Sequence, residues 1–72
     1  MALTYIGSLY SGLREDKKAL SYYLRGLDLS KKSNDDSFMN GLYRGIAVVY
    51  SDLADYEKAL KNFEKAYVLS LK

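Results

Sequence analysis

Few residues in this 72-residue chain can carry chemistry, and their types argue against catalysis. The sequence contains no histidine and no cysteine, so it lacks the commonest general base, the commonest metal ligand and any thiol nucleophile. Acidic residues cluster at Asp35–Asp36 and at Asp52 and Asp55, where helix caps and turn residues are the better use. No nucleophile–base pair, glycine-rich phosphate loop or metal spacing is present in the sequence. We therefore expect no enzymatic activity, no metal site and no cofactor.

Basic residues form two rows with a spacing of seven. The rows are Lys18, Arg25 and Lys32, and then Lys58, Lys65 and Lys72. Seven residues make about two helical turns, so each row would follow one helix face and could meet an acidic protein, a membrane surface or a phosphate backbone. Asp28 and Glu64 dilute these rows, Glu57 and Lys61 are placed to pair along a helix, and the net charge is only +2. A solvated helix face is therefore the favoured interpretation over a functional basic patch.

Length and composition describe one small helical domain. A chain of this size buries only about 60% of the surface of its unfolded form, and small scaffolds usually need a staple or an association to be stable. No proline interrupts the chain, so long helices are allowed. No apolar run approaches the roughly 20 residues of a membrane helix, and the start, MALTYIGSLYSG, lacks the basic region of a signal peptide. We expect a cytoplasmic location and no membrane partner.

The sequence repeats itself with a period of 40 residues. A shift by this length aligns identical residues from the first helical face to the end of the chain, including the turn between helices. The identical pairs are Ile6/Ile46, Tyr10/Tyr50, Ser11/Ser51, Leu13/Leu53, Lys18/Lys58, Ala19/Ala59, Leu20/Leu60, Leu29/Leu69, Ser30/Ser70 and Lys32/Lys72. The chain is therefore expected to hold two copies of one structural unit.

Within each copy the apolar residues recur with a helical period. One helix face carries Ala19, Leu20, Tyr23, Gly26 and Leu27, and the matching face carries Ala59, Leu60, Phe63, Ala66 and Tyr67. We predict four antiparallel helices at about 2–13, 16–31, 36–53 and 56–71. The first repeat is placed at about 1–32, the linker at about 33–35 and the second repeat at about 36–72, all within one domain spanning 1–72.

Caps and small residues refine this prediction. Asp55 is expected to cap the last helix and Asp35 or Asp36 the third, while Glu15 is a poorer cap at the place that matches Asp55. A glycine inside a helix costs about 1 kcal/mol relative to alanine, so Gly7 and Gly26 predict contacts too close for a methyl group. Tyr5 and Tyr22 are expected to be free, whereas the core faces should hold Tyr10, Tyr23, Tyr43, Tyr50, Tyr56 and Tyr67, which argues against a base-stacking surface.

This pattern of aromatic, large and small residues resembles the tetratricopeptide repeat family. The second copy carries its motif as Tyr43, Ile46, Ala47, Tyr50, Tyr56, Ala59, Phe63 and Ala66, and the first copy as Leu3, Ile6, Gly7, Tyr10, Ala19, Tyr23 and Gly26. The resemblance implies an all-α fold of two tandem helix-turn-helix hairpins, a segment of an α-solenoid superhelix.

Three features depart from the common pattern of the family. Asp16 replaces an aromatic residue at the first turn, Lys31 and Leu71 stand where the family has proline, and the period is 40 residues instead of the common 34. The extra residues, roughly 33–38, are expected to lengthen the helices on both sides of the linker. Similar longer repeats occur in kinesin light chains, in bacterial peptide-sensing regulators and in arrays attached to bacterial sensor proteins.

The resemblance also implies where a partner would bind. First helices of such repeats line a concave groove, which here would be lined by Thr4, Ser8, Ser11, Gly12, Arg44, Val48, Ser51 and Asp52. Arg44 is the only cation of this set and could bind a carboxylate bidentately; the alternative is an exposed arginine with no particular partner. Chaperone-binding members grip a C-terminal carboxylate with lysine and asparagine, but Ser8 and Val48 stand at the asparagine place, so that mode is not expected.

The sequence thus favours a non-enzymatic protein–protein interaction module that presents its groove to a peptide or a partner helix. Such a module would serve as a scaffold or as a sensory or regulatory domain of a larger protein. Its apolar first and last helices lack the polar caps of terminal repeats, which we take to indicate a fragment of a longer array. The alternative is a self-assembling unit whose copies stack or exchange hairpins. A binder of nucleic acid or acidic surfaces through the basic rows is less favoured.

Overall fold

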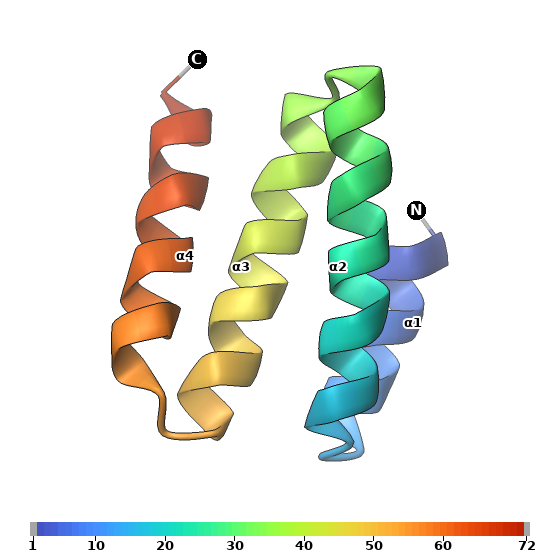
Figure 1. Cartoon of the computed structure of the whole chain (residues 1–72), viewed down its shortest axis with the longest axis vertical. Helices are drawn as coiled ribbons and strands as arrows, with labels where there is room; N and C mark the ends of the chain where they lie inside the picture. The colour runs from blue at the N-terminus through green and yellow to red at the C-terminus, as the bar shows by residue number, and fades with distance from the viewer. Residues whose placement is uncertain (1, 72) are drawn as a thin grey trace.

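Four α-helices make up the chain in the computed structural model, which describes the backbone of residues 2–71 and the side chains of residues 5–71. They are α1 (Ala2–Gly12), α2 (Asp16–Ser33), α3 (Asp36–Asp52) and α4 (Tyr56–Ser70). Helices α1 and α2 form one antiparallel hairpin, α3 and α4 form the other, and α3 packs against α2 (Figure 1). The prediction of an all-α pair of helical hairpins is confirmed, with helix ends within two residues of those expected.

The two hairpin turns have the same backbone conformation. Arg14 and Ala54, which are 40 residues apart, both have a φ of 62°. In each turn the next N–H returns to the end of the first helix, from Glu15 to the carbonyl of Tyr10 at 2.8 Å and from Asp55 to the carbonyl of Tyr50 at 2.9 Å. The sequence repeat is therefore a structural repeat that includes the turn.

Side-chain caps begin the helices of the second hairpin. Asp35 caps α3 and Asp55 caps α4, each accepting a hydrogen bond from the backbone N–H three residues ahead, at 3.0 Å and 3.4 Å. Of the two candidates for α3, Asp35 rather than Asp36 is thus the cap. Glu15 makes no cap hydrogen bond to α2, and its carboxylate instead pairs with Lys18 at 3.0 Å.

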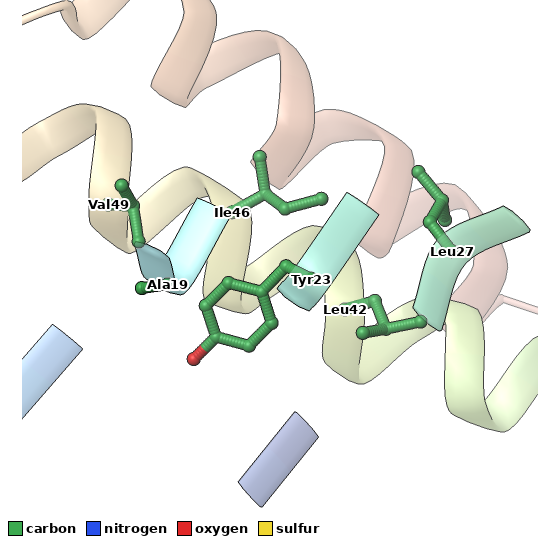
Figure 2. Close-up of a cluster of buried hydrophobic side chains, with 6 residues drawn as sticks. All are labelled: Ala19, Tyr23, Leu27, Leu42, Ile46 and Val49. Atoms are coloured by element: carbon green, nitrogen blue, oxygen red, sulfur yellow. The ribbon is translucent and has the colours of Figure 1, made fainter. Parts of the chain in front are cut away.

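The core lies between the two hairpins and is centred on Tyr23. Its buried side chains come from α2 and α3 and are Ala19, Tyr23, Leu27, Leu42, Ile46 and Val49, with the Tyr23 ring in the middle of the row (Figure 2). Tyr10, Tyr43 and Tyr50 are partly buried against this cluster, as expected from their positions. A single layer of side chains therefore joins the hairpins.

Two glycines make room for the Tyr23 ring. A Cβ atom added at Gly7 of α1 would lie 2.8 Å from the Cε1 atom of Tyr23, and one added at Gly45 of α3 would lie 2.6 Å from its Cζ atom. Both distances are shorter than real Cβ contacts. The close contact expected at Gly7 is confirmed, Gly26 is buried in α2, and the contact at Gly45 was not expected from the sequence.

The outer face of α4 is exposed, which corrects the expected placement of two tyrosines. Tyr56 and Tyr67 were predicted to lie in the core, but 68% and 65% of their surface is exposed. The physical reason is that α3 covers the matching face of α2, whereas α4 packs on α3 alone among the described helices. Tyr22, expected to be free, stacks on Tyr10 with ring centroids 5.5 Å apart.

Candidate binding groove

A hollow of about 390 Å³ opens where α1 and α3 lie beside each other. Ser8 and Ser11 of α1 and Arg44 and Val48 of α3 line it, so the structure brings together four of the residues that the family resemblance assigned to a groove. The other lining residues are Tyr23, Gly41, Gly45 and Phe63. The hollow thus joins both hairpins.

The remaining predicted groove residues lie elsewhere. Ser51 is half-buried one turn beyond Val48, and Gly12 and Asp52 are exposed at the ends of their helices; none of the three lines the hollow. Thr4 falls outside the described side chains. The groove as formed here is therefore centred on the middle of α1 and α3.

Sequence reasoning missed the contribution of the second helices. Tyr23 and Phe63, from α2 and α4, reach the hollow because the serines of α1 and the glycines of α3 that line it are too small to cover them. The available signal was the pair Gly41 and Gly45, which flank Arg44 on the same side of α3. Two glycines one turn apart leave the helix backbone open at this face.

Arg44 is the one charged side chain among the described residues that line the hollow. It is exposed, and none of the salt bridges or cation–π contacts found within residues 5–71 involves it. It also borders a second hollow of about 280 Å³ between α3 and α4, beside Asn40, Phe63 and Tyr67. A free guanidinium therefore stands between two hollows with partly apolar walls.

Hydroxyl groups complete the polar lining of the groove. Burial raises the pKa of Tyr23 above its ordinary value, and a hydrogen bond with Ser8 opposes this shift in part. The phenol is therefore neutral at neutral pH and available as a hydrogen-bond donor. Ser11 adds a hydroxyl one turn further along α1. Within the part of the chain that is described, no cluster of three acidic, histidine or cysteine side chains could hold a metal ion.

The basic rows are engaged in contacts within the chain. Ring contacts at 5.5–5.6 Å place Lys18 over Tyr10, Arg25 over Tyr22, Lys58 over Tyr50 and Lys65 over Tyr43. Lys32 pairs with Asp28 at 3.6 Å, and the expected pair of Glu57 and Lys61 forms at 3.8 Å. Lys72 lies outside the described residues. Each described cation of the rows thus has a partner in its own chain, in contrast to Arg44.

Comparison with known sequences assigns the family. A sequence model described as the tetratricopeptide repeat matches residues 2–33 and 42–70. The chain belongs to the tetratricopeptide repeat family. Regulatory protein RapK of Bacillus subtilis (strain 168) is 30% identical to it over 57 residues, which are 79% of this chain and 15% of RapK. This tetratricopeptide pair therefore spans a small part of that relative's length, and no solved structure matches it.

Membership of the tetratricopeptide repeat family defines the role of each helix. Helices α1 and α3 are the first helices of their repeats, and α2 and α4 are the second ones. The family implies protein–protein interaction or scaffolding. No helix in the described part of the chain combines the length and the apolar character that crossing a membrane requires.

Proposed function

We propose that this tetratricopeptide pair is a non-enzymatic regulatory or scaffolding module whose groove binds a peptide segment of a partner protein through a carboxylate. The observation that carries the proposal is Arg44, a cation without an ion pair among residues 5–71, at the edge of a hollow of about 390 Å³. A guanidinium matches a carboxylate with two parallel hydrogen bonds. The likeness to a protein named as regulatory supports the regulatory side of this proposal.

The lining of the hollow suits a peptide with an acidic residue next to an apolar one. The hydroxyls of Ser8, Ser11 and Tyr23 can bond to peptide carbonyl and N–H groups, while Val48 and Phe63 offer apolar surface. Phe63 and Val48 are 42% and 46% exposed, so both have surface left to bury. A buried apolar anchor beside a charged hydrogen bond is the usual composition of an interface hot spot.

Selection from a random peptide library on the immobilised chain tests the proposal. Enriched peptides should contain Asp or Glu, and fluorescence anisotropy should show that Arg44→Ala weakens their binding by about tenfold or more, as expected for a hydrogen bond to a charged group. The matched control is Lys31→Ala, which removes an exposed cation of α2 that lines none of the hollows described above. Enrichment of basic peptides, or equal binding by the Arg44→Ala variant, would contradict the proposal.

A further inference from the structure

A third hollow lies between α3 and α4, on the side of their contact that faces away from Arg44. It holds about 680 Å³, more than either hollow beside Arg44, and it lies toward the end of α4 marked C in Figure 1. Phe63 and Lys65, which line different hollows, are two positions apart and so project on nearly opposite sides of α4. We call this space the lysine hollow, after Lys61 and Lys65 in its wall. None of its lining residues lines either hollow beside Arg44.

The floor of the lysine hollow is apolar. Met39 and Tyr43 of α3 and Leu69 of α4 are partly buried there, and Val68 of α4 keeps 57% of its surface exposed. A volume of about 680 Å³ lies within the range of small-molecule sites, which are lined mostly by apolar and aromatic side chains with a few polar groups. The hollow therefore has room and surface for the apolar body of a small molecule.

Two ammonium groups stand at one end of this floor. Lys61 and Lys65 are one turn apart on α4 and line the same hollow. The Nζ atom of Lys65 lies 5.5 Å from the centroid of the Tyr43 ring, and this contact leaves ammonium N–H groups available to a carboxylate. Lys61 pairs with Glu57 at 3.8 Å, but the two side chains are 67% and 83% exposed, so the pair is weak and Lys61 can turn to a ligand.

Two carboxylates in the lining set the direction of a bound anion. Asp36 lies seven residues before Tyr43, about 10 Å along the axis of α3, so it repels an anion from the far end of the floor. Glu64 is exposed at the near end, where it opposes an anion in part, but two cations outnumber it there. An anionic head is therefore favoured at the two lysines, with an apolar body extending along the floor.

The second helix of the first repeat does not carry the same wall. At the positions that correspond to Lys61 and Val68 of α4, α2 has Ser21 and Asp28. Only the cation at Lys65 has a basic counterpart, Arg25. The folding of a hairpin therefore does not require Lys61 and Val68 at these places.

We propose that the lysine hollow binds a small amphipathic carboxylate. The head is held between Lys61 and Lys65 by charge-assisted hydrogen bonds, and the apolar body lies on Met39, Val68 and Leu69. Because this site shares no residue with the groove at Arg44, it stands if the proposed groove function fails.

Titration of the 72-residue chain with decanoate, followed by nuclear magnetic resonance below micelle-forming concentrations, tests the proposal. Saturable shifts of backbone amides are expected at Met39, Tyr43 and Leu69. Acetate keeps the head without the body, and decyltrimethylammonium keeps the body with the opposite charge. Both should bind at least about tenfold more weakly than decanoate. Binding of decyltrimethylammonium as tight as that of decanoate would overturn the proposal.

Variants of the chain test the role of each charge. Lys65→Gln should weaken decanoate binding by about fivefold, and Glu64→Gln should strengthen it by about twofold. The matched control is Lys58→Gln, because Lys58 makes the same contact with the Tyr50 ring at 5.5 Å two turns earlier on α4 but does not line the hollow. Equal losses in the Lys58 and Lys65 variants, or weaker binding by Glu64→Gln, would contradict the proposal.

Arg44→Ala separates this site from the groove. It should leave the decanoate affinity unchanged, and circular dichroism should show that all variants stay helical. If Arg44→Ala abolishes decanoate binding and the shifts fall on Ser8 and Val48, the carboxylate binds in the groove of the proposed function, and the assignment of the lysine hollow is wrong.

Discussion

The second helices of the two repeats have the same pattern of residues but different surroundings. Ala19 and Ala59 are both buried, with 0% and 4% of their surface exposed. About three turns further along the helix the two diverge, since Ser30 of α2 is fully buried whereas Ser70 of α4 is exposed. Burial in this fold is therefore decided by the neighbouring hairpin as much as by the helix's own sequence.

The stabilising contacts are therefore of two kinds, those within a hairpin and those between the two hairpins. Contacts within a hairpin occur in both repeats, and the backbone hydrogen bond of the turn and the buried alanine are common to the two. Contacts between hairpins exist once, in the row of side chains around Tyr23. In repeat proteins the interface between neighbouring repeats is a large part of total stability, so side-chain truncations on the buried face of α2 should cost far more stability than the matching truncations on the exposed face of α4.

The largest expected difference is between the two central rings. Tyr23→Ala should reduce the free energy of unfolding by about 3–5 kcal/mol, as for other buried aromatic side chains. Phe63→Ala should cost only about 1 kcal/mol, because 42% of that side chain is already exposed. Urea denaturation followed by circular dichroism measures both. Equal losses would show that Phe63 is covered in solution and would remove the distinction between the two faces.

A smaller effect is expected from two glycines one turn apart on α3. Gly45→Ala should destabilise the chain by about 1–3 kcal/mol, because the new methyl group would lie against the enclosed ring of Tyr23. Gly41→Ala is the matched control, since a Cβ there meets no atom within 4 Å and alanine favours the helix by up to about 1 kcal/mol. Thermal unfolding should show the two variants shifted in opposite directions. A Gly45→Ala variant as stable as Gly41→Ala would contradict the close contact.

The smallest effect is expected from the phenolic hydroxyl, which Tyr23 carries and its counterpart Phe63 lacks. Burial raises the pKa of Tyr23 above 10.0, so the folded chain holds this proton more tightly than the unfolded chain. Stability is then fully retained below about pH 10 and falls as the pH rises through the higher folded pKa. Tyr23→Phe should make this alkaline loss smaller, as measured by urea midpoints along a pH series.

A second group, Lys18, also has a raised pKa and would contribute to the loss of stability at alkaline pH. Glu15 raises the pKa of Lys18 through a hydrogen bond and its charge, and this shift also removes stability as the pH rises. Both chains should therefore carry Lys18→Gln. If Tyr23→Phe has the same pH profile as its parent in that background, the phenol of Tyr23 does not titrate differently in the folded chain.

Much of the fold could be predicted from the sequence because its signals are local. The caps at Asp35 and Asp55, the repeated turn and the helical period are all set by residues within a few positions of one another. The role of Gly45 was hidden because its counterpart in the first repeat is Tyr5, so the repeat gave no sign of it. The exposure of Tyr67 was missed for another reason: periodicity shows which face is apolar and says nothing about which helix covers it.

The groove was predictable in part for the same reason. Ser8, Ser11, Arg44 and Val48 follow from their register on first helices, and they do meet in one hollow. The contributions of Tyr23 and Phe63 depend on gaps left by small side chains of other helices, which only the packed structure defines. The contacts of the basic rows were also predictable only where they are local. Lys18 pairs with Glu15, three residues away, whereas Lys65 lies over the ring of Tyr43 on another helix.

The packing of α4 on α3 alone also has a kinetic consequence. A helix held by one neighbour can detach while the other three stay folded, so the amide protons of α4 should exchange with solvent through a local opening rather than through global unfolding. Each such opening carries away Phe63, one wall of the hollow beside Arg44. A ligand that contacts Phe63 and Ser8 together would connect α4 to the first hairpin, and its residence time would be limited by how often α4 opens.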